Sequence, residues 1–277
     1  MTEPVRTRNP RGRPRTGGAG SAGAVQALDR ALRLLTLVAG SDGIGLTDLA
    51  QRAGMAPSTA HRLLTTLQAR GFVDYQEKPG HWLIGVECFR VGSAFVRRAK
   101  VAEAGRAVMH GLMEETGETV NLAVAEDGDV VFVSQVEAHE PIRAFFSPGT
   151  RGAAHASGIG KALLAELPDA AVRRLLQRKG LPGFTEKTIV EPERLFAGLA
   201  EIRARGWALD DEERNRGMRC IAAPIYNEYG EAVAGISISG PTGRIADDRI
   251  GEIGPQVKRA AAEITKAIGG IAPERSS

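Results

Sequence analysis

Residues 46–71, LTDLAQRAGMAPSTAHRLLTTLQARG, constrain the fold more than any other part of the chain. They contain two helical patterns separated by a short turn at Gly54, and Thr47 is placed to cap the first helix. The second helix, expected over residues 57–70, carries its apolar side chains at the spacing i, i+3, i+4 and i+7 of one buried face. These side chains are Ala60, Leu63, Leu64 and Leu67. Two helices joined by a short turn that contains glycine predict a helix-turn-helix.

The second helix is polar on the side opposite its apolar face, mainly near its N-terminal end. The polar residues there are Ser58, Thr59, His61, Arg62 and Thr65. A recognition helix points this end at base edges in the major groove. We therefore predict a DNA-contacting surface, with Arg62 as the candidate for a guanine contact. A solvated helix face is the plain alternative. A catalytic pair of Ser58 and His61 has no nearby acid to orient the histidine.

A hairpin is expected directly after this helix. FVDY and HWLIG are rich in residues that favour strands, and they flank a turn at Pro79-Gly80. A hairpin in this position is the wing of a winged helix-turn-helix. Lys78 and His81 lie in it, and we expect them to contact phosphates or the minor groove. Thr47 is a further expected DNA contact.

The positive charge of the chain belongs to its first residues. Residues 1–20 hold five arginines against Glu3 alone, a net charge of +4, whereas the whole chain carries +3. Residues 8–23, RNPRGRPRTGGAGSAG, have no apolar side chain large enough to pack, so we expect an extended arm that is disordered in isolation. Arg11, Arg13 and Arg15 would then enter the minor groove of bound DNA. A solubilising tail is the alternative.

The rest of the chain indicates a second domain. A helical pattern from Val86 predicts a linker helix, and strands and amphipathic helices follow it, including a strand over 142–149, IRAFFSPG. This mixture predicts an α+β unit, similar to GAF or PAS sensor domains. The expected organisation is a basic arm at 1–22, a winged helix-turn-helix at 23–85 (mainly α with a β-wing), a linker helix at 86–104 and an effector-binding domain at 105–277.

Several functional classes lack their sequence patterns. His155 and Ala162 occupy positions where a phosphate-binding loop needs Gly and Ser or Thr. The five histidines show no zinc-binding spacing, and Cys88 and Cys220 form no disulfide framework. The sequence has no apolar run of 18 residues that could span a bilayer. The N-terminal arginines are not followed by an apolar stretch, so we expect no secretory signal. We expect a cytoplasmic protein without catalytic residues, cofactor or metal.

Two segments of the second domain suit a small anion. Residues 157–160, SGIG, open a helix, where free backbone N–H groups and the helix dipole favour a carboxylate. Ser237 and Ser239 alternate with isoleucines, so both hydroxyls point to one face of a strand. A polar outer sheet face is the alternative for these serines, core packing is the alternative for Cys220, and a solvated loop is the ordinary interpretation of the acidic run 210–213.

In combination these features resemble the IclR family of transcriptional regulators. The resemblance runs from about Gly23 to Gly270 and is carried by the helix-turn-helix stretch, HWLIGVECFRVGSAF, TGETVNLAV, HASGIGKALL, ALDDEE, GMRCIAAPIYNEYGE and ISISGPTGRI. It is strongest to the branch that responds to glyoxylate or pyruvate, which includes the acetate-operon and allantoin repressors. It implies a DNA-binding regulator with a C-terminal effector-binding domain.

The resemblance also assigns the effector site. The residues that it implies are Gly158, Ile159, Asp210, Met218, Cys220, Ser237 and Ser239. Two departures from the branch bear on the ligand. Ile159 stands where relatives usually have alanine and should narrow the pocket, whereas the small residues 152–154 should widen it. An aromatic or sugar acid therefore remains an alternative to a 2-oxoacid such as glyoxylate.

The expected partners follow from the same resemblance. A homodimer, or a dimer of dimers, would bind a pseudo-palindromic operator in double-stranded DNA, and a small carboxylate would control that binding. An enzyme acting on a small oxoacid is the rival from another class. It would use Cys220 or Ser239 as nucleophile, but the nearby sequence supplies no base.

Overall fold

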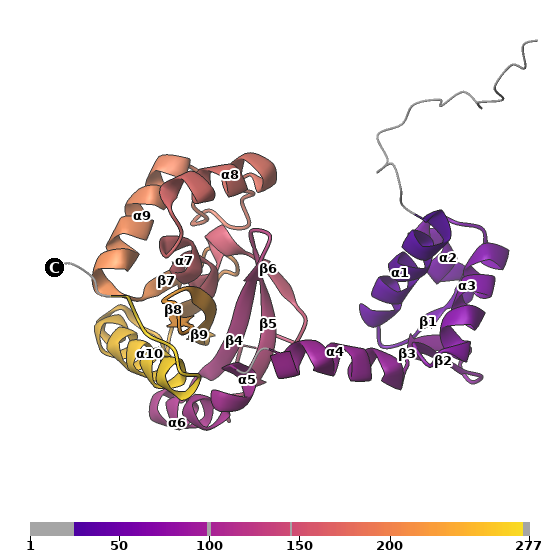
Figure 1. Ribbon diagram of the computed structural model, residues 1–277, viewed down its shortest axis with the longest axis horizontal. Helices are drawn as coiled ribbons and strands as arrows, with labels where there is room; N and C mark the ends of the chain where they lie inside the picture. Colours follow the sequence, from indigo (N-terminus) through magenta and orange to yellow (C-terminus); the bar gives the residue numbers. More distant parts are fainter. Residues whose placement is uncertain (1–24, 99–100, 145, 274–277) are drawn as a thin grey trace, which may run out of the picture. The chain divides into compact units, whose positions relative to one another are not determined.

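The computed structural model describes residues 25–98, 101–144 and 146–273 (Figure 1). Within it the chain forms two compact units that divide between Ser93 and Ala94. This division falls within helix α4, Val86–Arg98. The domain limits expected from the sequence stay predictions, and each unit is described below by itself.

The N-terminal unit packs three helices against a small antiparallel sheet in the order β1-β3-β2. Its elements are α1 Gln26–Ala39, β1 Ile44–Gly45, α2 Leu46–Ala53, α3 Pro57–Ala69, β2 Val73–Gln76 and β3 His81–Ile84. Helices α2 and α3 with the β2–β3 hairpin form the predicted winged helix-turn-helix. The core of the unit contains Leu34, Leu49, Leu64 and Trp82, each at most 3% exposed.

Local sequence explains the helix ends in this unit. Gly54 ends α2 in the left-handed conformation, which glycine adopts without strain. Pro57 occupies the first turn of α3, where its missing N–H costs nothing. The expected cap at Thr47 is wrong. Strand β1 runs directly into α2, so Gly45 takes the N-cap position and Thr47 lies inside the first turn.

The C-terminal unit is built on a six-stranded antiparallel sheet in the order β6-β5-β4-β9-β8-β7. Its strands are β4 Thr119–Glu126, β5 Asp129–Val136, β6 Arg151–Ala153, β7 Ala208–Asp211, β8 Met218–Tyr226 and β9 Ala232–Pro241. Its helices are α5 Val101–Ala104, α6 Arg106–Thr116, α7 Gly158–Ala165, α8 Asp169–Lys179, α9 Pro192–Arg205 and α10 Asp247–Ala267, and a 3₁₀ turn covers Ala154–Ala156.

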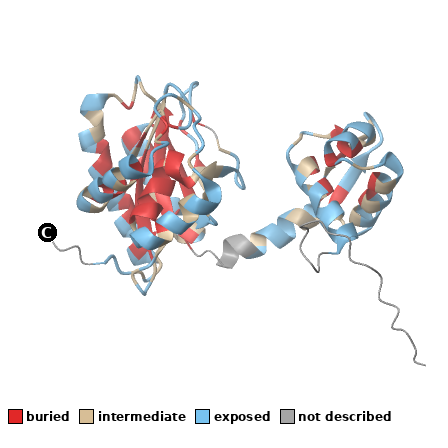
Figure 2. Ribbon diagram, turned by 90° about the horizontal axis from the view of Figure 1, so that it is seen from above, coloured by how far each residue is buried: buried red, intermediate tan, exposed pale blue. Residues whose placement is uncertain are grey.

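Helices cover both faces of this sheet. Helices α6 and α10 pack on one face over a core that includes Ile221, Ile236 and Ile238. Helices α7 and α9 lie on the other side, where Ile159 and Leu199 are among the buried residues. Figure 2 shows the buried residues gathered between these layers. The arrangement confirms the expected α+β class.

The strand expected over residues 142–149 is wrong. Among the described residues of that range the backbone forms no strand, and the short β6 begins only at Arg151. The cause is the Ser-Pro-Gly sequence. Thr150 donates its backbone N–H to the carbonyl oxygen of Ser147, and Gly149 has a φ of +90°, so the chain turns there before it joins the sheet.

No helix within the described ranges is long and apolar enough to cross a membrane.

Candidate functional sites

The polar face of α3 is a continuous exposed surface. Ser58, His61, Arg62 and Thr65 are all exposed, and Thr59 is half-buried. Thr65 donates its hydroxyl to the backbone oxygen of His61, 2.9 Å away, so its side chain is held against its own helix. In the part of the chain that the structure describes, the guanidinium of Arg62 has no ion-pair partner. It is therefore available for an external acceptor.

The wing contacts the same helix through an aromatic side chain. The ring of Trp82 on β3 meets the ring of His61 edge-on, with 6.4 Å between centroids, and the ring centroid of Tyr75 on β2 lies 4.9 Å from that of Trp82. Lys78 is exposed in the hairpin turn. His81 is half-buried and packs beside Gly43.

The remaining expected DNA contacts, Thr47 and the N-terminal arginines, lie outside α3 and the wing. Thr47 is exposed on the first turn of α2. Arg11, Arg13 and Arg15 lie outside the described residues. The structure thus brings Ser58, Arg62 and Thr65 together on one face, and the roles of all these residues in DNA binding stay predictions.

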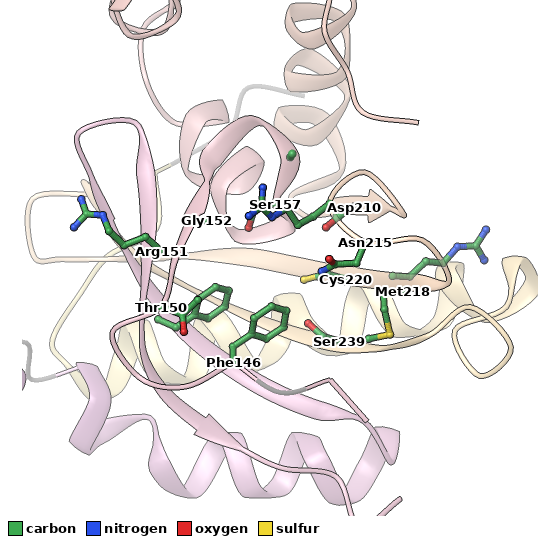
Figure 3. A pocket seen from close by; sticks show the side chains of 14 residues that line it. Phe146, Thr150, Arg151, Gly152, Ser157, Asp210, Asn215, Met218, Cys220 and Ser239 are labelled. Carbon is green, nitrogen blue, oxygen red and sulfur yellow. The ribbon is translucent and has the colours of Figure 1, made fainter. Parts of the chain in front are cut away.

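A cavity of about 230 Å³ opens in the C-terminal unit between the start of α7 and strands β7 to β9 (Figure 3). Its walls come from segments far apart in the sequence. The lining residues are Phe132, Phe146, Thr150, Arg151, Gly152, Ala156, Ser157, Asp210, Arg214, Asn215, Met218, Arg219, Cys220 and Ser239. Four of the seven residues implied as effector contacts are therefore in this wall: Asp210, Met218, Cys220 and Ser239.

Strand register places three of these residues side by side. Asp210 on β7 is the direct partner of Cys220 on β8, and Cys220 is the direct partner of Ser239 on β9. Thr119 on β4 pairs with Ser239 and extends the row. Direct partners in an antiparallel sheet point to the same face. One row across four strands therefore presents a carboxyl, a thiol and two hydroxyls to the α7 side.

The start of α7 lies directly on this row. Ser157 is the N-cap, and its Oγ accepts a hydrogen bond from the backbone N–H of Gly160 at 3.4 Å. A Cβ atom at Gly158 would lie 2.9 Å from the sulfur of Cys220, which is closer than real side chains approach. Glycine at 158 thus lets the positive end of the helix dipole approach the sheet.

Two acidic residues near the pocket are buried, which corrects the expectation that 210–213 is a solvated loop. Asp210 is 8% and Glu213 is 5% exposed. Burial raises the pKa of Asp210 to about 7, and the negative charge of Glu213 adds to the effect. The Lys161 ammonium opposes it, as does the backbone N–H of Glu213, which donates to Asp210 Oδ1 at 2.8 Å.

Glu213 is held by an ion pair with Lys161 of α7, and both side chains are 6% exposed. Burial nevertheless raises the pKa of Glu213. Its Oε2 atom is buried and has no hydrogen-bond partner among the described residues. This pair connects α7 to the loop that follows β7, next to Asp210 in the pocket wall.

Cys220 is a neutral thiol in this setting. Burial raises its pKa to about 11, and the carboxyl of Asp210 raises it further, although the hydroxyls of Ser237 and Ser239 and the N–H of Gly158 oppose the shift. A thiolate is the nucleophilic form of cysteine. The environment therefore favours Cys220 as a weak hydrogen-bond donor over a nucleophile.

The other expected effector residues lie behind the wall. Ser237 is fully buried, and it pairs across the strands with Ala222 and Asn121. The side chain of Ile159 is fully buried in the apolar core and packs on Gly235. It is not in the cavity wall, so the expectation that it narrows the pocket is wrong. Its backbone alone belongs to the helix start. Of residues 152–154, only Gly152 lines the cavity.

Several wall residues were missed from the sequence. Phe132 and Phe146 stack with 4.7 Å between ring centroids and close one side. Arg151, Arg214 and Arg219 also line the cavity; Arg151 is ion-paired with Glu126, and Arg214 lies over the ring of Phe184. Arg151 directly precedes the small residues 152–154, and this position was the signal in the sequence that it could line the pocket. Arg219 forms ion pairs with Asp211 and Asp247.

Comparisons with known proteins agree with both units. The IclR helix-turn-helix domain profile matches residues 27–77, and the profile for the C-terminal part of bacterial IclR transcriptional regulators matches residues 93–266. The HTH-type transcriptional regulator BhcR of Paracoccus denitrificans is 50% identical over 278 residues, covering 100% of this chain and 99% of the relative. The acetate operon repressor of Salmonella typhimurium is 44% identical over 273 residues, covering 98% and 99%.

A solved structure has the same fold and contains a ligand. It is an IclR homologue from Microbacterium hydrocarbonoxydans in complex with 4-hydroxybenzoate, 25% identical, with a TM-score of 0.77 over 88% of this chain and 99% of the other.

Proposed function

The chain belongs to the IclR family of bacterial transcriptional regulators, and we propose that it is a repressor whose operator binding is controlled by a small 2-oxoacid, most simply glyoxylate. The observation that carries the ligand class is the row of Asp210, Cys220 and Ser239 under the start of α7. Hydrogen-bond donors and the positive end of a helix dipole converge there, which suits a carboxylate. A regulator of this kind acts on DNA in the cytoplasm.

The exposed face of α3 supports the DNA-binding half. Arg62 would donate to a guanine, with Ser58 and Thr65 near it on the same face. Lys78 in the hairpin turn and the N-terminal arginines would contact phosphates or the minor groove.

Exposed apolar side chains support a homodimer. Val25, the N-cap of α1, and Leu28 and Leu32 within the helix follow one another at helical spacing, and each is more than half exposed. Phe89 on α4 is 77% exposed. Apolar surface of this kind is usually covered by a partner. A second copy of this chain would cover it and would supply the second recognition helix for a pseudo-palindromic operator, with paired dimers on the full site.

The cavity favours a small ligand. Its volume of about 230 Å³ is below the ~300–1,000 Å³ typical of sites for larger molecules. An aromatic acid is the second candidate, because the stacked pair of Phe132 and Phe146 offers an apolar wall. The relative that was solved with 4-hydroxybenzoate shows that this fold can hold such a ligand. Hydrolytic or transferase chemistry at Cys220 is disfavoured by its raised pKa.

Calorimetric titration of the full chain tests the ligand class. Glyoxylate, pyruvate, oxalate, succinate, benzoate and 4-hydroxybenzoate are titrated separately. We expect saturable glyoxylate binding that becomes at least tenfold weaker, but stays measurable, in Ser239→Ala and in Asp210→Ala. Ser134→Ala, on β5 outside the cavity wall, is the matched control and should bind normally. Binding of 4-hydroxybenzoate alone would replace the 2-oxoacid with an aromatic acid, and no binding of any acid would refute the proposed ligand class.

A further inference from the structure

A buried amide connects the pocket to the strand beyond it. Asn121 on β4 is 0% exposed and does not line the cavity. Its Nδ2 donates to Ser239 Oγ at 3.2 Å, and its Oδ1 accepts from Gln135 Nε2 at 2.8 Å. Strand register fixes this geometry, because Asn121 lies opposite Gln135 of β5 on one side and Ser237 of β9 on the other. Both groups of the Asn121 amide are thus satisfied inside the sheet.

The direction of these hydrogen bonds decides what Ser239 can offer to a ligand. An amide nitrogen can only donate, and an amide oxygen can only accept. Because Gln135 donates to the oxygen of Asn121, the nitrogen of Asn121 must face Ser239. Ser239 Oγ is then occupied as an acceptor on that side, and its single O–H is not taken up by Asn121, so it can turn from the Cys220 sulfur to a ligand in the cavity.

The opposite direction would give the pocket a different chemistry. With both amides turned round, Ser239 would donate to Asn121 and present only lone pairs to the cavity. A carboxylate ligand would then meet an acceptor instead of a donor, and it would lose a charge-assisted hydrogen bond. Asn121 and Gln135 therefore decide whether Ser239 donates or accepts in the cavity, although neither amide lines the cavity itself.

We propose that Asn121, oriented by Gln135, is a positioning residue that fixes the Ser239 hydroxyl as a hydrogen-bond donor to a ligand oxyanion. The inference rests on the proposed function in one respect, namely that the ligand carries a carboxylate. It adds a determinant of ligand class that lies outside the cavity wall. It also assigns the buried Asn121 a role in ligand binding in addition to its role in the stability of the sheet.

A double-mutant cycle tests the assignment with glyoxylate as the probe. Asn121→Asp has the same shape, and its carboxylate form can only accept from Ser239, so we expect glyoxylate to bind at least tenfold more weakly above the pKa of that carboxyl. Combined with Ser239→Ala, the change should add almost nothing to the loss caused by Ser239→Ala alone. Repulsion between the new carboxylate and glyoxylate would not depend on Ser239 and would persist in the Ser239→Ala background. If the losses in binding free energy of the two single variants simply add in the double variant, the inference is overturned.

Gln135→Met supplies a variant without new charge. It removes the donor that orients Asn121, and we expect a smaller loss in the same direction that also disappears in the Ser239→Ala background. Thermal unfolding of each variant shows whether the fold is intact. Normal glyoxylate affinity in a folded Gln135→Met protein and in a folded Asn121→Asp protein would overturn the inference.

A spectroscopic readout separates the amide pair from the ligand proposal. The chain has four asparagines, at 9, 121, 215 and 227, so ¹⁵N-asparagine labelling gives few side-chain amide signals. Asn121→Leu identifies the signal of Asn121. We expect Ser239→Ala and Gln135→Met each to shift it. An unshifted signal would overturn the inference. A shifted signal in a protein that binds none of the acids would keep the orienting role of Asn121 and refute the proposed function.

Discussion

Cys220 of β8 and Ser239 of β9 are direct register partners, and both side chains line one cavity. They are separated by 18 residues in the sequence but face α7 together because they occupy one row of the sheet. Asp210 continues the row on β7. The floor of the cavity is therefore a property of strand register. A shift of one residue in β9 would turn Ser239 away and bring Ile238 or Gly240 to the same place.

The same row explains why an anion can enter a site that contains an aspartate. With its pKa raised to about 7, Asp210 carries a proton in much of the population near neutral pH, and Cys220 is neutral. The ion pair of Lys161 and Glu213 lies behind them. Little negative charge therefore faces the ligand, while the start of α7 contributes the positive end of its dipole.

Glyoxylate should bind more tightly at pH 6 than at pH 8. Loss of the Asp210 proton as the pH rises through about 7 places a negative charge beside the ligand carboxylate. Asp210→Asn keeps a neutral polar group and should remove most of this dependence. Calorimetry of both proteins at the two pH values measures the effect. Equal pH dependence in the variant would mean that another group is responsible.

The free energy of unfolding should also depend on the protonation of the Asp210 carboxyl. The pKa of Asp210 is higher in the folded protein than the ordinary value of 3.8, so between about pH 4 and 7 the folded state holds a proton that the unfolded state has lost. The free energy of unfolding should fall with rising pH in this window by up to about 1.4 kcal/mol per pH unit from this group. Asp210→Asn removes that contribution.

Chemical denaturation of the wild type and of Asp210→Asn at pH 5 and pH 8 measures the contribution of Asp210 to the free energy of unfolding. The variant should gain stability relative to the wild type on going from pH 5 to pH 8. A gap between the two proteins that stays constant with pH would contradict the raised pKa.

Lys161→Met should destabilise the C-terminal unit by roughly 3–5 kcal/mol, because it leaves the carboxylate of Glu213 buried without its partner. The double variant Lys161→Met/Glu213→Leu removes both charges and should recover most of the loss. Denaturant unfolding of the two variants gives both numbers. A double variant no more stable than the single one would show that the pair does more than neutralise its two charges.

Arg62→Ala should weaken binding to the specific operator by about 1–3 kcal/mol and relax the sequence preference at one base pair. Fluorescence anisotropy with specific and random duplexes at one salt concentration measures both. Gln68→Ala, an exposed neutral position on the same helix, is the control. If Arg62→Ala weakened both duplexes equally, Arg62 would be a phosphate contact instead of a base contact.

Removal of residues 1–20 should reduce the salt dependence of DNA binding. Each lost phosphate contact lowers the slope of log K against log salt by about 0.9 for duplex DNA. The segment contains five arginines. Titrations at four salt concentrations give the slope for both proteins. An unaltered slope would make the arm a solubilising tail.

The N-terminal unit could be predicted almost completely from its sequence. The spacing of Ala60, Leu64 and their neighbours defines one buried helix face, and Gly54 and Pro57 mark the ends of the two helices. These signals are local, because they depend on contacts within a few residues. The misplaced cap at Thr47 is a small error of the same local kind, caused by a strand that runs straight into its helix.

The effector site was predictable only in part. Resemblance to relatives marked Asp210, Cys220 and Ser239, but periodicity alone left the serines as an ordinary sheet face. Ile159 was expected in the cavity, whereas its side chain belongs to the core beside Gly235. At the start of α7 the backbone faces the ligand site, whereas some side chains face the core. The sequence does not indicate which side each of these residues faces.

By itself the sequence determined the helices, the strands that alternate polar and apolar residues, and the basic character of the arm. Only the tertiary structure decided which strands are neighbours. That order brings Asp210, Cys220 and Ser239 into one row, places Asn121 between Ser239 and Gln135, and buries Glu213 against Lys161. The physical reason is that hydrogen bonds between strands, and burial of charge, depend on residues far apart in the chain, such as Asn121 and Ser239 at 118 positions, which no local spacing encodes.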